Sequence, residues 1–158
     1  MIDGAMQPFA LTLDKFLAHA AKWRPTSEVV TARQDGAVDR IGYGALMARS
    51  QRVSSVLAGL GVRIGDRVAT LAWNTQAHFE AWYAITGMGA VCHTLNPRLT
   101  ADDLAAMVRR SEARLVIVSA DLVGLARKVA ERVPHPLRLL VIDGPAEGEA
   151  VALEPLIA

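Results

Sequence analysis

Cysteine is nearly absent from this sequence, because Cys92 is the single one in 158 residues. One thiol cannot build an internal disulfide framework or a metal cage made of cysteines alone. An excess of charge of one sign is also lacking, since the formal net charge is +1. Such a balance gives no electrostatic attraction for nucleic acid. We therefore expect no nucleic-acid partner and no fold stabilised by disulfides.

Long apolar runs are missing as well. Charges and glycines interrupt every stretch before it reaches the roughly 20 residues that a membrane-spanning helix needs. Residues 1–5 include an acid where a secretory signal needs a basic segment, and no continuous apolar segment follows them. These absences predict a cytoplasmic protein with no transmembrane segment.

Apolar residues in general are plentiful, at 52% of the chain, and this length and composition predict one globular domain with its own core. In residues 10–62 the apolar spacing and turn residues predict these elements: a helix at 12–23, a hairpin of strands at 28–33 and 37–41 about an Asp-Gly turn at 34–36, and a helix at 43–60. Thr12 is the expected N-cap of the first helix, and Gly61 is the expected end of the last one.

The pattern then changes to alternating strands and helices over residues 63–145. The predicted strands lie at 67–72, 90–94, 115–118 and 138–142, and the predicted helices lie at 74–87, 101–112 and 121–132. A strand that is apolar at every position has no solvent side, so these strands predict a parallel sheet that is covered on both faces. The predicted fold class is α/β, with a partial, doubly wound, mainly parallel sheet that has helices on both faces and follows a helix and a β-hairpin. Residues 146–158 are expected to be a connecting tail.

Familiar catalytic and phosphate-binding motifs are not found. The sequence has no Gly-x-Gly-x-x-Gly loop, no P-loop, no Gly-x-Ser-x-Gly elbow and no histidine pair at metal-binding spacing. Asp102 and Asp103 follow Thr100 and fit a helix capping box rather than an acid/base pair. Cys92 lies in an apolar strand and is expected to be a small core residue. We therefore predict no catalytic residue and no metal ligand in this chain.

Two segments suggest more than structure alone. The helix at 74–87 carries Phe79, Trp82 and Tyr83 on more than one side, so a second layer, a partner or a ligand must cover it. The segment 93–98 lies where a strand ends and a loop begins, which is the place where α/β sheets bind ligands. Arg98 in that loop is either an anion contact or a solvated arginine in a proline turn.

Several of these segments together resemble the adenylate-forming superfamily, and within it the fatty-acyl-CoA synthetases. They are Gly-Asp-Arg-Val at 65–68, the aromatic helix, the segment Gly-Met-Gly-Ala-Val-Cys-His-Thr-Leu-Asn-Pro-Arg-Leu at 87–99, and the strand at 115–118. The resemblance extends over about residues 10–145. It implies that residues 1–158 are the N-terminal part of the large adenylate-forming domain, in an enzyme that uses ATP, magnesium and CoA to activate a fatty acid.

The same resemblance implies roles for individual residues. Arg98 corresponds to an arginine that lies near the phosphates of CoA, and His93 and Asn96 are candidates for shaping its loop. Phe79, Trp82 and Tyr83 become candidates for a homodimer contact or for core cover. The family's phosphate loop and its small C-terminal domain are not in these residues, so we expect the chain to hold no cofactor and to be inactive by itself. The alternative is a non-catalytic α/β dimerisation module derived from the same family.

Overall fold

The computed structural model describes residues 10, 12–33 and 36–158. Its helices are α1 (Asp14–Trp23), α2 (Tyr43–Gly59), α3 (Gln76–Gly87), α4 (Ala101–Ser111), α5 (Val123–Ala130) and α6 (Glu154–Ile157), with a 3-10 turn η1 (Ala120–Leu122) before α5. Its strands are β1 (Glu28–Ala32), β2 (Val38–Gly42), β3 (Arg67–Leu71), β4 (Val91–Thr94), β5 (Leu115–Ser119), β6 (Arg138–Ile142) and β7 (Val151–Ala152). No helix in these residues is long and apolar enough to span a lipid bilayer.

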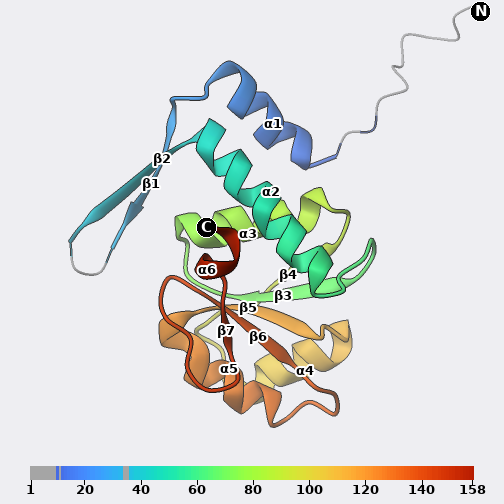
Figure 1. Cartoon of the computed structure of the whole chain (residues 1–158). Helices are drawn as coiled ribbons and strands as arrows, with labels where there is room; N and C mark the ends of the chain where they lie inside the picture. The colour runs from blue at the N-terminus through green and yellow to red at the C-terminus, as the bar shows by residue number, and fades with distance from the viewer. Residues whose placement is uncertain (1–9, 11, 34–35) are drawn as a thin grey trace, which may run out of the picture.

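The main sheet is parallel throughout and has the strand order β4-β3-β5-β6-β7. The chain goes from β3 outward to β4, returns to β5 on the other side of β3, and continues from there to β6. Helices α2, α3 and α6 cover one face of the sheet, while α4 and α5 cover the other (Figure 1). The predicted α/β fold with helices on both faces of a doubly wound parallel sheet is confirmed.

Strand β5 shows why both faces must be covered. All five of its residues are buried. Leu115 and Ile117 pack in the apolar cluster that includes α2 and α3, whereas Val116 and Val118 pack in the cluster that includes α4 and α5. Because successive side chains of a strand point to opposite faces, one apolar run supplies both clusters.

Two predicted helix ends are also confirmed. Helix α2 stops before Gly61, which has a φ of 95°, a conformation that glycine adopts without steric cost. Thr100 caps α4, since its Oγ1 accepts the N–H of Asp103 at 3.2 Å and donates to that residue's carboxylate at 2.6 Å.

The prediction for Thr12 was wrong, because α1 begins at Asp14 and no side chain caps it. The helix expected at 121–132 is instead divided into η1 and the shorter α5.

The N-terminal part of the chain packs over α2 and α3 and projects beyond the sheet. Strands β1 and β2 form the predicted antiparallel hairpin, which extends away from the main sheet beside α2 (Figure 1). Two residues of its predicted turn, at 34 and 35, lie outside the described residues, as do residues 1–5.

Residues 146–158 correct another expectation. They were expected to be a connecting tail, but they contain β7, which pairs with β6, and the short helix α6. Leu153 and Ile157 are almost fully buried in the cluster on the α2 side. These two residues are four apart, so they lie on one side of a helical turn, and Pro155 is well placed in the first turn.

Candidate functional site

The topology itself marks one edge of the sheet as the place for a site. Strands β3 and β5 are neighbours, and the chain leaves them in opposite directions. Ligands of open α/β sheets bind outside the carboxyl ends of the strands at such a switch point. In this chain, residues 72–75 follow β3 and residues 120–122 follow β5, so these two segments form the candidate edge.

Polar side chains at this edge are bonded to one another. Trp73 donates its indole N–H to Asp121 at 2.8 Å and its backbone N–H to Ser119 Oγ at 3.2 Å. Asp143, at the end of β6, accepts the hydroxyl of Thr75 at 2.8 Å and that of Ser119 at 3.4 Å. Removal of water from its carboxyl raises the pKa of Asp143, and the two hydroxyl donors oppose that change. The edge is therefore held by a continuous network across three strands.

His78 extends the network into α3. Its Nδ1 lies 3.1 Å from the carbonyl oxygen of Trp73, and its Nε2 lies 3.0 Å from Thr70 Oγ1. A carbonyl can only accept, so Nδ1 carries the proton and Nε2 accepts from the threonine hydroxyl. Burial lowers the pKa of His78. The ring is thus neutral and fixed in one tautomer near pH 7.

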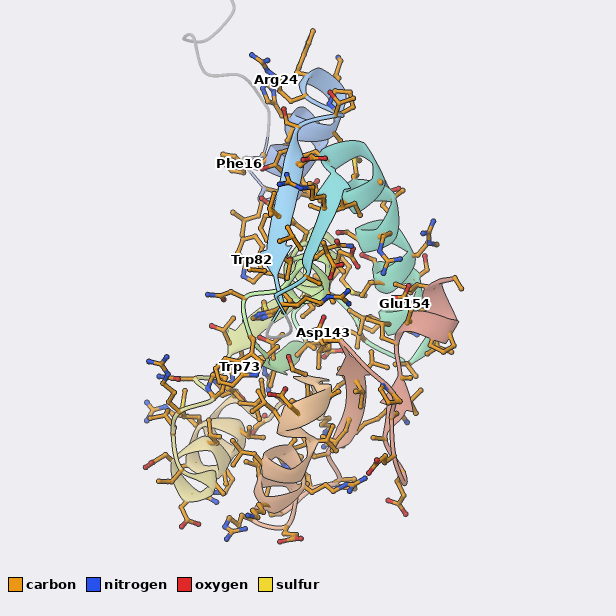
Figure 2. The ribbon with its side chains drawn as sticks, turned by 90° about the vertical axis from the view of Figure 1, so that its left-hand side faces the viewer. Phe16, Arg24, Trp73, Trp82, Asp143 and Glu154 are labelled. Atoms are coloured by element: carbon orange, nitrogen blue, oxygen red, sulfur yellow. The ribbon has the colours of Figure 1, made fainter. Side chains whose placement is uncertain are left out.

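A cavity of about 700 Å³ opens beside this network. One wall is β1 with Tyr43, and the opposite wall is the first half of α3 with the residues before it. The predicted residues Phe79, Trp82 and Tyr83 line it and are half-buried, and Phe79 and Trp82 each contact Tyr83 edge to face with ring centroids 5.0 Å apart. Figure 2 shows Trp82, Trp73 and Asp143 on the side of the molecule that carries the hairpin. The aromatic side of α3 is therefore the wall of an open cavity.

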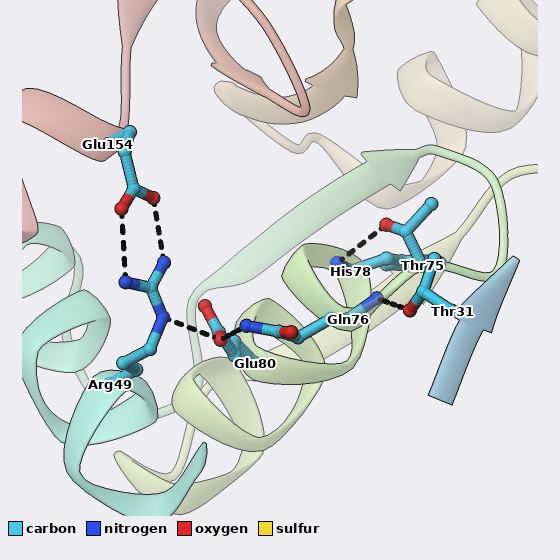
Figure 3. A network of polar contacts seen from close by, with 7 residues as sticks. All are labelled: Thr31, Arg49, Thr75, Gln76, His78, Glu80 and Glu154. Atoms are coloured by element: carbon cyan, nitrogen blue, oxygen red, sulfur yellow. Dashed lines mark hydrogen bonds and ion pairs between the residues drawn. The ribbon is translucent and has the colours of Figure 1, made fainter. Parts of the chain in front are cut away.

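A second polar network holds that wall in place (Figure 3). Thr31 of β1 accepts the backbone N–H of Gln76 at 2.9 Å, and the Gln76 amide donates to Glu80 at 2.8 Å. Glu80 is 1% exposed and also accepts Arg49 Nε at 2.7 Å. Arg49 reaches Glu154 of α6 with its two remaining nitrogens, at 3.0 and 2.7 Å. The hairpin, α3, α2 and α6 are thereby joined through one buried carboxylate.

The loop after β4 begins at the cavity, since Thr94 both ends the strand and lines the cavity. The side-chain oxygen of Asn96 in this loop accepts the N–H of Arg98 at 3.0 Å. The Arg98 side chain is exposed, and no hydrogen bond or ion pair occupies its guanidinium among the described residues. His93 instead contacts Ser111 Oγ at 3.0 Å, which ties it to the end of α4.

Cys92 and the possible metal ligands complete the list of candidate residues. Cys92 is half-buried, and burial raises the pKa of its thiol to about 11, so it is protonated at neutral pH. In the part of the chain that the structure describes, no three His, Cys, Asp or Glu side chains gather as a metal site.

Sequence reasoning missed the network of Thr75, His78, Ser119 and Asp143, and also the Arg49 and Glu80 pair. Ser119 and Asp143 could have been found, because each is the first polar residue after an apolar strand of the sheet, at the edge where ligands bind.

Comparison with known proteins gives the class of this fold. A profile of AMP-binding enzymes matches residues 17–155, and the chain belongs to that family. It is 32% identical over 152 residues to a 3-methylmercaptopropionyl-CoA ligase of Ruegeria lacuscaerulensis, and the aligned region covers 96% of this chain and 28% of that protein. It is 35% identical over 144 residues to a long-chain-fatty-acid–CoA ligase of Thermus thermophilus, and the aligned region covers 91% of this chain and 27% of that protein.

Solved structures of CoA ligases also have this fold. A benzoate CoA ligase of Burkholderia xenovorans superposes with a TM-score of 0.78 at 26% identity, covering 94% of this chain and 28% of that one. The resemblance to adenylate-forming CoA ligases is therefore confirmed. The chain spans little more than a quarter of the length of these relatives.

Proposed function

We propose that this chain is the N-terminal segment of a medium- or long-chain fatty-acid–CoA ligase, and that the whole enzyme works in the cytoplasm. The observation that carries the proposal is the continuous similarity to a long-chain-fatty-acid–CoA ligase, at 35% identity over 144 residues. The cavity at the carboxyl edge of the sheet has an apolar and aromatic part formed by Val30, Phe79 and Trp82, which is consistent with an enzyme of apolar acids.

The proposed reaction has two steps. A carboxylate oxygen of the fatty acid attacks the α-phosphorus of ATP, and pyrophosphate leaves with the electron pair of the broken bond. The sulfur of CoA, after loss of its proton, then attacks the acyl carbonyl, and AMP leaves. Magnesium neutralises phosphate charge in such reactions. No cluster of three or more His, Cys, Asp or Glu ligands occurs among the described residues. The proposal assigns the metal site and the phosphate loop to the rest of the enzyme and predicts that the chain alone is inactive.

Within that enzyme, this chain contributes the cavity and the Arg98 loop. Asn96 fixes the loop backbone, while the guanidinium of Arg98 stays exposed and unpaired in the described structure. A guanidinium fork matches the oxygens of a phosphate group. We assign Arg98 to the phosphates of the CoA nucleotide.

Steady-state kinetics of the complete enzyme with Arg98→Gln test this assignment. The KM for CoA should rise about tenfold, which corresponds to the loss of one charge-assisted hydrogen bond, with the KM values for ATP and fatty acid unchanged. Arg110→Gln is the matched control, because Arg110 is an exposed arginine of α4 outside the loop. An unchanged KM for CoA in Arg98→Gln would show that Arg98 does not bind CoA.

A non-catalytic dimerisation module is the second candidate, because Phe79, Trp82 and Tyr83 are only half-buried. Sedimentation of the 158-residue chain tests the module, because a monomer would contradict it. The ligase proposal allows a monomer or a dimer and is distinguished by a coding sequence that continues beyond Ala158. The module predicts a dimer that Trp82→Ala disrupts, with a coding sequence that stops after Ala158.

A further inference from the structure

A second cavity lies at the opposite edge of the sheet, where the strands begin. Its volume is about 580 Å³, which is within the range of small-molecule sites, roughly 300–1,000 Å³. It is lined by the end of α2, the segments that enter β3, β5 and β6, and the residues around His135. Neither the proposed ligase reaction nor the similarity to known enzymes gives this cavity a role.

Three arginines line this cavity from neighbouring strands. Arg67 begins β3, Arg114 precedes β5, and Arg138 begins β6. The backbone places them side by side, since Arg138 N–H donates to the Arg114 carbonyl at 2.9 Å and Val68 is opposite Leu115 in the ladder. In the ladder Arg138 is opposite Leu115, the residue after Arg114, so Arg138 leaves the sheet on the α2 side while Arg114 starts on the other side. Both side chains nevertheless line the cavity, because it lies at the edge where the strands begin.

Two of these arginines have no carboxylate partner. Of the two carboxylates in the cavity, Glu112 is bound by Arg67 at 2.8 Å, while Asp66 accepts only the neutral backbone N–H of Arg63 at 2.7 Å. The three arginines therefore outnumber the two carboxylates of the lining by one charge. Arg114 and Arg138 form no ion pair with any described residue. Arg138 has one long contact, 3.4 Å, to the Leu60 carbonyl.

His135 adds an oriented ring. Its Nε2 is 2.9 Å from the carbonyl oxygen of Ala113, so Nε2 carries a proton and donates it. The other nitrogen, Nδ1, has no hydrogen bond to a described residue. The cavity thus combines two guanidinium groups that form no ion pair with a described residue and one ring that is held in a fixed orientation.

We propose that this cavity binds the phosphate group of a small organic phosphate through Arg114 and Arg138. A phosphate carries up to two negative charges on three free oxygens, which suits two guanidinium groups better than a single carboxylate would. The cavity is larger than a phosphate ion, and Leu60, Val62 and Leu115 supply apolar surface for an organic remainder. This site goes beyond the proposed ligase function and does not depend on it.

Titration of the 158-residue chain followed by heteronuclear NMR at constant ionic strength tests the proposal. The ligands are AMP, pyrophosphate and inorganic phosphate. We expect saturable shifts at residues 60–68, 112–115 and 135–138, with at least about tenfold weaker binding in Arg114→Gln/Arg138→Gln. The side chains of Arg114 and Arg138 are exposed, so the double variant should fold. If the double variant does not fold, the single variant Arg114→Gln replaces it in the titration.

The matched control is Arg24→Gln/Arg110→Gln, which removes the same charge from exposed arginines outside the cavity (Arg24 is labelled in Figure 2). It should bind as the unaltered chain does. Tighter binding of AMP than of phosphate identifies an organic phosphate as the ligand, while equal binding identifies free phosphate and corrects the proposal to that smaller ligand. Shifts that do not saturate, or equal affinity in all variants, would overturn it. Ligase activity is not needed for this measurement, so its failure is distinct from failure of the proposed function.

Discussion

On the face of the sheet covered by α2, α3 and α6, a buried carboxylate joins the helices, whereas the face covered by α4 and α5 has an ion pair only at its surface. Glu80 is 1% exposed and bonds to Arg49. On the other face, Arg132 bonds to Asp102 at 2.8 Å, but the Asp102 side chain is 85% exposed. Both faces also have an apolar cluster. The difference therefore lies in where the charges are.

The buried pair restricts structure more than the exposed one. A carboxylate taken out of water is tolerated only if its partners are correctly placed. Glu80 needs both Arg49 and Gln76, which in turn connect to α6 and β1. The cavity lined by Phe79 and Trp82 lies beside α3. The elements on this face of the sheet are thus fixed relative to one another by directional bonds.

Glu80→Ala should have the largest effect of the changes that test this comparison. It leaves Arg49 partly buried with one partner fewer, and the expected loss is about 3 kcal/mol in the free energy of unfolding, measured by urea denaturation. Glu80→Gln keeps the volume and one acceptor oxygen, so it should lose clearly less. Equal stability of Glu80→Ala and the unaltered chain would mean that the buried pair does not hold this face together.

Glu154→Gln should have an intermediate effect that depends on pH. Hydrogen bonds from Arg49 lower the pKa of Glu154 below its ordinary value of 4.5. A lowered carboxyl pKa stabilises the fold above the unfolded pKa, and that contribution is lost as the pH falls through the folded pKa. Since the side chain is 67% exposed, we expect a loss of about 1 kcal/mol or less at pH 7.

Denaturation curves between pH 7 and pH 3 check this prediction, because the difference between the unaltered chain and Glu154→Gln should shrink as the pH falls. Asp143→Asn is the control with the opposite sign. The raised pKa of Asp143 means that its charged form is disfavoured in the fold, so the unaltered chain gains stability relative to this variant as the pH falls through that pKa. A constant difference for Glu154→Gln would refute the role of its charge.

Asp102→Asn should have the smallest effect, below about 0.5 kcal/mol, because exposed ion pairs contribute little. It is matched to the Glu80 variants, since each removes a carboxylate that bonds to an arginine Nε. Urea denaturation in low and high salt measures this loss in the free energy of unfolding. If Asp102→Asn cost as much as Glu80→Ala, burial would not be the reason for the difference between the two faces.

The contrast also explains how far the sequence could predict the molecule. The strands β3, β5 and β6 were predictable because an apolar run of strand length is a local signal, and Gly61 and Thr100 mark helix ends locally too. The Arg98 loop and the aromatic residues of α3 were found as strand-end and helix-face patterns. All of these signals lie within a few neighbouring residues.

What could not be predicted depends on contacts between distant residues. Glu80 looks like an ordinary helical acid until Arg49, from another helix, lies against it. The tail containing Leu153 and Ile157 has few residues and a proline, and it becomes ordered because β6 offers an edge to pair with. The cavity beside Phe79 exists because the hairpin lies across from α3, which no local pattern indicates.

The most direct test of the account is the activity of the protein encoded by the complete gene that contains this chain. We predict that it forms AMP and acyl-CoA from ATP, CoA and straight-chain fatty acids of medium or long chain length, faster than with 3-methylmercaptopropionate. The 158-residue chain purified alone should form no acyl-adenylate. A complete protein that ends at Ala158, or that makes no AMP with any of these acids, would contradict the account.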